Sequence, residues 1–181
     1  MIISHWLYHR VPDPIVGDTL YPLNRLDRIY PEVAAKEKRK YDLRKNLVAV
    51  RLPILNCLWN DVIHLSPLHP SKIKESLIKA GCLQQAPRRS YFVIDPQSLE
   101  PGGAVFFRHS KDTNGNYDFL AEDFSLFESS RYRELESVPE EQLAYFIQMR
   151  NEGKKPLLWA RTSHVLFQGE IKIKDVEIVE W

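Results

Sequence analysis

The C-terminal part of the chain shows the clearest alternation of apolar and polar residues. Residues 171–174 read Ile-Lys-Ile-Lys, and the same period continues through Val176 and Ile178 to Trp181. Strict alternation of this kind predicts strands with one buried face. A short stretch at residues 164–167, His-Val-Leu-Phe, comes just before, and Gly169 marks a turn between the two stretches. We therefore expect residues 157–181 to form mostly sheet.

Other short apolar runs predict further strands. Each contains β-branched or aromatic residues and is bounded by residues that favour turns. The runs lie at residues 4–11, 47–55, 60–67, 91–94 and 104–108. The first ends at a Pro-Asp-Pro sequence, and Pro53 weakens the end of the second.

Three segments carry helix signals. Residues 31–45 begin with a proline followed by strong helix formers, and residues 71–81 place three apolar side chains on one face before Gly81. Residues 137–151 begin with a serine cap and acidic residues, where the helix dipole favours them, and Gly153 follows. Residues 20–26 are expected to be irregular or a short helix. Strands with a few helices between them favour an α+β fold over a doubly wound parallel sheet.

The composition is that of a globular protein with an ordinary core. The chain has 181 residues, of which 44% are hydrophobic and 27% charged, which predicts one domain spanning residues 1–181. No apolar run reaches the roughly 18 residues that a membrane span needs, and the N-terminus lacks a basic region before an apolar stretch. We expect a cytoplasmic protein with no membrane partner. Cys57 and Cys82 are expected to be reduced, because they form neither a disulfide framework nor a zinc motif.

The net charge of +1 conceals an uneven distribution. Residues 1–51 carry ten basic and six acidic side chains, whereas residues 118–181 carry eight and thirteen. Six of the basic residues fall between Lys36 and Lys45. This basic window can contact the phosphates of nucleic acid, or it can be the solvated face of a helix. Both interpretations stay open from the sequence.

Histidines are the main candidates for chemistry, because familiar nucleotide and hydrolase motifs are missing. The chain contains no GxGxxG, GxxxxGK[ST], HExxH or GxSxG. His5 and His9 share one strand face but lack a third ligand, so no metal site is expected. His64 lies in an apolar strand close to Asp61, an arrangement found in acid–base sites and in ordinary cores. Large aromatics that can wall a nucleotide pocket are Trp6, Tyr8, Tyr21 and Trp59.

The order of several short motifs resembles that of ADP-ribosyltransferase-like domains, in particular the DarT-type DNA-modifying toxins and their small bacterial relatives. The motifs are residues 7–11 (LYHRV), 62–66 (VIHLS) before a helix, 91–96 (YFVIDP), 163–167 (SHVLF) and 171–178. This resemblance implies an α+β fold with split mixed or antiparallel sheets and a few flanking helices. It also implies NAD as substrate and transfer of ADP-ribose to a nucleic-acid or protein acceptor.

The resemblance assigns roles to individual residues. His9 is the histidine that binds the NAD ribose, with Arg10 beside it, and His64 and Ser66 lie on the second motif strand. His164 stands where the family has its late glutamate, and Glu170 is the nearest acid after it, so these two are the catalytic candidates. Two further cofactor-binding candidates come from the residues themselves. Tyr21 can form an aromatic wall, and the guanidinium of Arg161 can bind a phosphate through two hydrogen bonds.

Two other functions are compatible with the same residues. The first is a non-catalytic module that binds nucleic acid or an acidic protein through the basic window, with an affinity that falls steeply as salt is added. The second is an enzyme that processes RNA or cyclic phosphates, with His9 and His64 as an acid–base pair. It requires the two imidazoles to lie within about 10 Å of each other.

Overall fold

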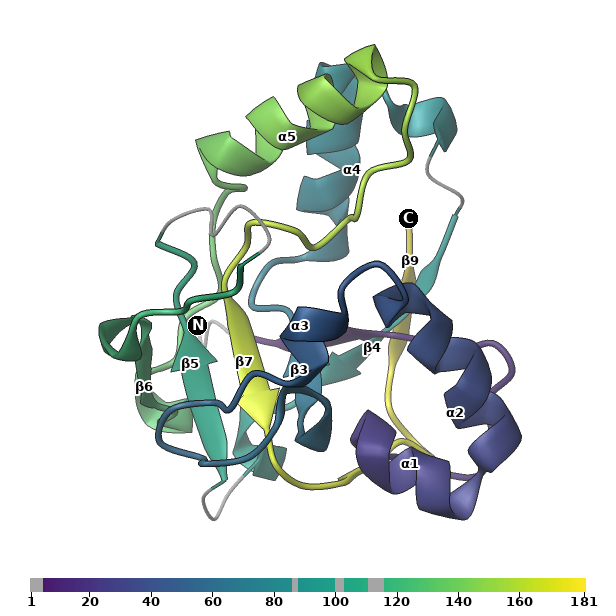
Figure 1. Ribbon diagram of the computed structural model, residues 1–181, viewed down its shortest axis with the longest axis vertical. Helices are drawn as coiled ribbons and strands as arrows, with labels where there is room; N and C mark the ends of the chain where they lie inside the picture. The colour runs from purple at the N-terminus through teal and green to yellow at the C-terminus, as the bar shows by residue number, and fades with distance from the viewer. Residues whose placement is uncertain (1–4, 86–87, 100–102, 111–115) are drawn as a thin grey trace.

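The structure is a computed structural model that describes residues 5–85, 88–99, 103–110 and 116–181 (Figure 1). Its strands form three antiparallel sheets. Short helices lie around them, which confirms the predicted α+β class with antiparallel sheets. Among the residues in these ranges, no helix is long and apolar enough to cross a membrane.

The largest sheet has the strand order β3-β7-β5-β6. Its strands are β3 (Ile63–Leu65), β7 (His164–Phe167), β5 (Ala104–Phe107) and β6 (Phe124–Leu126). The second sheet has the order β1-β4-β9, formed by β1 (Leu7–Arg10), β4 (Ser90–Ile94) and β9 (Ile178–Glu180). A two-stranded sheet joins β2 (Thr19–Leu20) to β8 (Ile171–Lys172).

The two larger sheets meet at one backbone bridge between Tyr8 and Ser66. The amide of Tyr8 donates to the carbonyl of Ser66 at 2.9 Å, and the amide of Ser66 donates back to Tyr8 at 2.8 Å. Tyr8 lies in the middle of β1, and Ser66 directly follows β3. We call the place where β1 passes the end of β3 the seam. It brings one motif strand of each sheet side by side.

The helices lie in two groups and one isolated turn (Figure 1). Helices α1 (Leu23–Ile29) and α2 (Pro31–Lys38) contact each other, as do α4 (Pro70–Ala80) and α5 (Glu140–Asn151). The short α3 (Lys45–Val48) lies in front of β3 and β7 in this view. The 3-10 turns that matter below are η1 (Arg39–Tyr41) and η2 (Trp59–Asp61).

Helix α4 follows its sequence signals closely. Pro70 occupies the first turn, the imidazole of His69 accepts a hydrogen bond from the Ser71 amide, and Gly81 ends the helix with φ of 72°. Glycine suits that position because it has no Cβ to strain the left-handed backbone. The predicted helix at residues 71–81 is therefore confirmed, and it buries Ile73 and Leu77.

Replacing Gly81 with alanine is expected to lower the free energy of unfolding by about 1 kcal/mol, the cost of a Cβ in the left-handed region. The added Cβ would also meet Nη1 of Arg150 at 2.8 Å, but that flexible side chain can move away. Gly153→Ala is the matched control. Its φ is also left-handed, at +66°, but nothing lies within 4 Å of the added Cβ, so it shows the backbone cost without a neighbouring side chain. Urea unfolding measures both. An unchanged or increased stability of Gly81→Ala would contradict the assignment.

The four-stranded sheet is covered on both faces over β3, β7 and β5, whereas its edge strand β6 is largely exposed. Ile63, Leu65, Val165 and Phe167 belong to the core cluster that also contains Leu7 of β1. On the opposite face, Leu166, Val105 and Phe107 pack with Trp59 and Leu47. This explains why residues 165–167 form a continuous apolar run after His164. Cys57 and Cys82 are buried free thiols.

The prediction of a strand at residues 47–55 is wrong. The segment begins inside α3 and then turns, because Ile54 and Asn56 adopt left-handed backbone with φ of 67° and 51°. Only Arg51 makes a ladder contact there, an isolated bridge to Leu58. Leu47 is buried on the sheet from a helical turn, so its apolar character reflects burial and not strand pairing.

Other predicted boundaries also change. The helix expected at residues 31–45 ends at Lys38 and is followed by η1. The α-helix does not continue to residue 45, because the Lys40 carbonyl accepts a hydrogen bond from Nη2 of Arg44, at 2.6 Å. Residues 157–160 form a turn and not sheet, since Nε2 of Gln142 donates to the carbonyls of Leu158 and Ala160. The helix expected from residue 137 begins at Glu140, without a side-chain cap. Residue 4, the start of the first predicted strand, lies outside the described residues.

Candidate functional site

His64 and His164 face each other on the Leu166 side of the four-stranded sheet. The register pairs His64 with Leu166, and His164 lies two residues before Leu166 on β7, so both imidazoles project from the same face. Their ring centroids are 6.3 Å apart, with an edge-to-face angle of 85°. Both residues are partly buried. Strand pairing therefore holds two imidazoles in one place without any loop.

Backbone carbonyls fix the tautomers of both rings. Nε2 of His64 lies 2.9 Å from the carbonyl oxygen of Trp59, and Nδ1 of His164 lies 3.0 Å from that of Thr162. A carbonyl only accepts hydrogen bonds, so we assign the proton of each neutral ring to these nitrogens. Nδ1 of His64 and Nε2 of His164 then keep their lone pairs. The two rings are equipped to accept a proton or a hydrogen bond.

His9 joins this pair from the other sheet. It lies next to Tyr8 on β1, at the seam, and its charge lowers the pKa of His64. Within the described part of the chain, the buried Nδ1 of His9 has no hydrogen-bond partner. Buried polar atoms are normally paired, so this nitrogen is a candidate contact for a ligand.

All three imidazoles are neutral near pH 7. Burial is the main cause in each case, and it lowers the pKa of His9 to about 4, that of His64 to about 3 and that of His164 to about 4. For His64 the charge of His164 is the next cause, and for His9 it is the charge of Lys40. His164 and His9 therefore oppose the protonation of His64.

An aromatic wall connects this histidine cluster, His9, His64 and His164, to η1. The Trp59 ring lies 4.6 Å from that of His64 and stacks on Phe119 at 5.5 Å. The side chain of Trp59 lowers the pKa of Tyr41, against the effect of burial, so the two side chains are neighbours. The cations of Lys40 and Arg44 lie over the Tyr41 ring, at 5.4 and 5.1 Å from its centroid.

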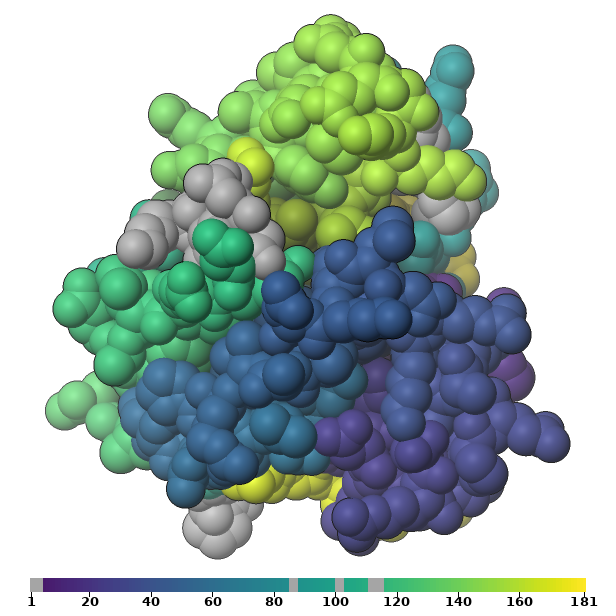
Figure 2. Space-filling view, viewed as in Figure 1, coloured from purple at the N-terminus to yellow at the C-terminus, as the bar shows by residue number. Residues whose placement is uncertain are grey.

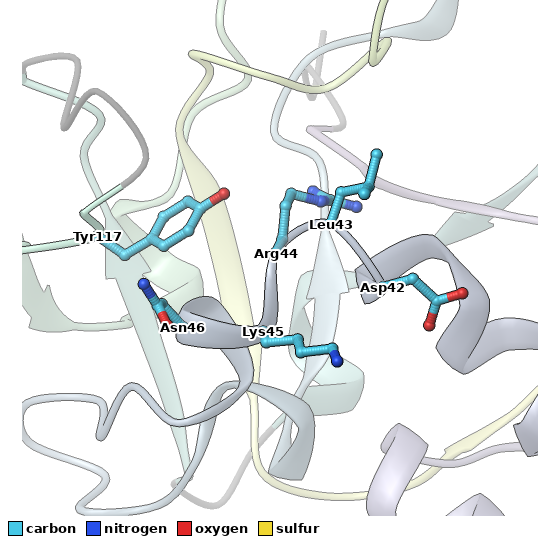
Figure 3. A pocket seen from close by; sticks show the side chains of 6 residues that line it. All are labelled: Asp42, Leu43, Arg44, Lys45, Asn46 and Tyr117. Carbon is cyan, nitrogen blue, oxygen red and sulfur yellow. The ribbon is translucent and has the colours of Figure 1, made fainter.

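Arg44 also lines an open hollow of about 250 Å³ on this side of the molecule. Figure 3 shows the side chains of Arg44 and Tyr117 reaching into the hollow from opposite sides, with Asn46 below Tyr117. In Figure 2 the blue segment that contains η1 and α3 borders the green segment that contains Tyr117. The lining residues are Asp42, Leu43, Arg44, Lys45, Asn46 and Tyr117. A series of side-chain contacts, from Arg44 to Tyr41, Trp59 and His64, therefore links the hollow to the histidine cluster.

A second hollow, of about 320 Å³, has the opposite charge. It lies against β4 and β8, where Asp95, Asp175 and Glu177 line it together with Trp6 and a single cation, Lys172. An anionic ligand would be repelled there. The basic hollow beside Arg44 and Lys45 is therefore the better location for a phosphate-bearing ligand.

The structure brings together three of the eight residues predicted from the sequence. His9, His64 and His164 form the cluster described above. Arg10 is an exposed neighbour on β1, and its charge contributes to the low pKa of His9. The buried Ser66 lies beside them in the backbone, but its hydroxyl donates to the Leu68 carbonyl and accepts from the Leu68 amide, both at 3.0 Å.

The other three predicted residues lie elsewhere. Glu170 follows the C-terminal end of β7, whereas His164 begins that strand, and Glu170 pairs with Arg25 of α1 at 3.1 Å. Tyr21 belongs to the same group, since the Arg25 guanidinium lies 5.4 Å from its ring. Arg161 is on the loop before β7, with its guanidinium 5.1 Å from the ring of Tyr145 on α5.

The basic window is largely engaged within the chain. Lys36 donates to the Asp13 carbonyl at 2.7 Å, Lys38 pairs with Asp27 at 2.8 Å, and Lys40 pairs with Glu37 at 3.4 Å. Arg44 donates to the Lys40 carbonyl. These contacts reduce the charge that the window can offer to an extended nucleic acid.

Three residues of the site were not predicted: Tyr41, Arg44 as a lining residue, and Tyr117. Tyr41 stands within the basic window, and an aromatic residue among cations is a signal of nucleotide contact that could have been used. Tyr117 carries no such signal, because its role depends on left-handed backbone with φ of 57°.

Among the residues with a described placement, no three His, Cys, Asp or Glu side chains are grouped so as to hold a metal ion. Comparison of the chain with protein-family models, with curated proteins and with solved structures finds no match.

Proposed function

We propose that the protein binds NAD at the seam, as an ADP-ribosyltransferase-like domain. One observation carries this proposal. The three motif strands β1, β3 and β7 each contribute a histidine, and these histidines come together where the two larger sheets meet. The hollow lined by Arg44, Lys45 and Tyr117 is linked to His64 through Tyr41 and Trp59, and it offers cations to a phosphate-bearing ligand and an aromatic ring to a base.

In this proposal His9 contacts the ribose, and its unpartnered Nδ1 supplies the hydrogen bond. The cluster lacks a group that favours cleavage of the bond between nicotinamide and ribose. Breaking the bond between nicotinamide and ribose develops positive charge on the sugar, which a carboxylate stabilises best. His164 is neutral near pH 7 and Glu170 is paired with Arg25, so neither supplies a negative charge to the cluster.

Glu37 is a carboxylate whose charge does reach the cluster. It raises the pKa of His9 and pairs with Lys40 at 3.4 Å. We therefore expect NAD to bind, and nicotinamide to be released slowly unless Glu37 moves toward the sugar. The acceptor of ADP-ribose would approach through the open hollow, where Leu43 is 98% exposed.

Replacement of His9 with alanine is expected to raise the dissociation constant of NAD about tenfold, the effect of losing one hydrogen bond of about 1.4 kcal/mol. Isothermal titration calorimetry measures the constant, and chromatography of the same mixture measures free nicotinamide. His69→Asn is the matched control, because asparagine preserves the helix cap and His69 lies outside the cluster. NAD binding that is equally tight in His9→Ala and in the control would argue against this site.

A further inference from the structure

The two facing imidazoles have a feature that ribose binding does not use. Nδ1 of His64 and Nε2 of His164 are both lone-pair nitrogens on rings 6.3 Å apart, and carbonyls hold the opposite nitrogens as donors. If each ring takes up one proton, both become double donors without any change of ring orientation. Protonation therefore converts Nδ1 of His64 and Nε2 of His164 from hydrogen-bond acceptors into donors.

The charged groups around the pair favour an anion as the trigger for that change. Lys40 and His9 act on His64, and His109 acts on His164, all as cations or potential cations. Arg10 adds a positive charge near His9. The exception among these neighbours is Glu37, which acts on His9 and is paired with Lys40.

We propose that His64 and His164 bind a phosphate group of the ligand and take up protons from solvent as it binds. A phosphate group, in a monoester or in a pyrophosphate, offers at least two non-bridging acceptor oxygens, which match the two imidazolium N–H donors. Lys40, whose charge acts on His64, adds positive charge nearby. The anion stabilises the charged rings, which burial and the neighbouring cationic groups otherwise keep neutral. No bond other than the hydrogen bonds forms or breaks, and the buffer supplies the protons.

The phosphate can come from two sources: the pyrophosphate of NAD, or a terminal phosphomonoester of another molecule. The proposal concerns the phosphate alone, so it does not depend on NAD binding. A neutral cluster without an anion would remain deprotonated down to about pH 4. Proton uptake near pH 6 is therefore a specific signature of anion binding at these rings.

The test is calorimetric titration of inorganic phosphate into the full chain near pH 6, in two buffers with different ionisation enthalpies. The difference between the two measured enthalpies gives the protons taken up. We expect uptake of at least about one proton, after correction for phosphate's own ionisation. Binding without net uptake by the protein would overturn the proposal, as would the absence of phosphate binding at concentrations of about 10 mM.

The matched variants keep the structural hydrogen bonds and remove the titration. In His64→Gln the amide nitrogen replaces Nε2 as donor to Trp59, and in His164→Asn it replaces Nδ1 as donor to Thr162. The double variant should lose proton uptake and bind phosphate about tenfold or more weakly. His69→Asn should bind as the wild type does. Unchanged binding and uptake in the double variant would overturn the assignment to these rings.

NAD and nicotinamide riboside, which lacks phosphate, complete the experiment. If phosphate competes with NAD and the riboside binds without proton uptake, the NAD pyrophosphate is the source. If phosphate binds with uptake and NAD does not bind, the phosphate site stands and the NAD proposal fails. If NAD binds without proton uptake and phosphate does not compete, the NAD proposal stands and the phosphate site fails.

Discussion

Acidification from about pH 7 to about pH 5 is expected to lower the free energy of unfolding by about 3 to 5 kcal/mol through the histidine cluster alone. The folded pKa values of His9, His64 and His164 lie at about 4, 3 and 4, below the ordinary histidine value of 6.5. The unfolded chain therefore binds more protons than the folded chain in this range. The stabilisation is complete above about pH 6.5 and is lost as the pH falls toward the folded values.

Urea unfolding at several pH values measures this dependence. The double variant His64→Gln with His164→Asn is the comparison, because it keeps both donors to backbone carbonyls and removes two of the three titrating rings. Its stability should vary much less between pH 7 and pH 5, by about one third of the wild-type change. Equal slopes for the two proteins would show that these rings are not held neutral in the folded state.

Leu166→Ala is expected to lower the free energy of unfolding by about 2 to 5 kcal/mol, the usual cost of deleting a buried leucine side chain. Leu166 is fully buried in the middle of β7 and pairs with His64 on one side and Val105 on the other. The cavity would open between the strands that carry His64 and His164. The variant should therefore also weaken ligand binding at the cluster.

Leu126→Ala is the matched control on the same sheet. Leu126 pairs with Val105 from the edge strand β6, but its side chain is 68% exposed. Its truncation should change stability by no more than about 0.5 kcal/mol. Urea unfolding of both variants checks the contrast. Similar losses in the two variants would mean that β7 is not the buried centre of this sheet.

The strands that the sequence predicted best are those buried on both faces. Residues 91–94, 104–107 and 165–167 are continuous apolar runs, and they lie in β4, β5 and β7 in the middle of their sheets. Burial on both faces leaves few polar positions, so such a run is hard to mistake. Residues 47–55 are equally apolar, but Leu47 reaches the core from a helical turn. Composition alone does not distinguish these two ways of being buried.

The histidines could be predicted from the sequence as site residues because they interrupt apolar strands. A polar ring between Ile63 and Leu65 must find a partner, and Nε2 of His64 finds one in the Trp59 carbonyl. The position of Glu170 could not be predicted in the same way. It depends on the turn after β7, which leads the chain away from His164 and toward Arg25. Sequence distance along a strand does not show which end of that strand faces the site.

The basic window illustrates a similar difficulty with charge. Its cations are close together in the sequence, but Lys36 contacts a backbone carbonyl and Lys38 pairs with Asp27. These partners come from segments 23 and 11 residues earlier in the chain, so a local charge count does not detect them. Arg44 is positioned by the Lys40 carbonyl, which directs it over Tyr41 and into the hollow.

The most direct test of the NAD site is a proton NMR titration of the histidine rings with NAD. The side-chain resonances of His9, His64 and His164 would be assigned by single substitutions and followed alongside those of His5 and His69. We expect shifts at the three clustered rings, saturating with one common dissociation constant, and little change at His5 and His69. NAD binding that shifts His5 or His69 and leaves the three clustered rings unchanged would contradict the proposed site.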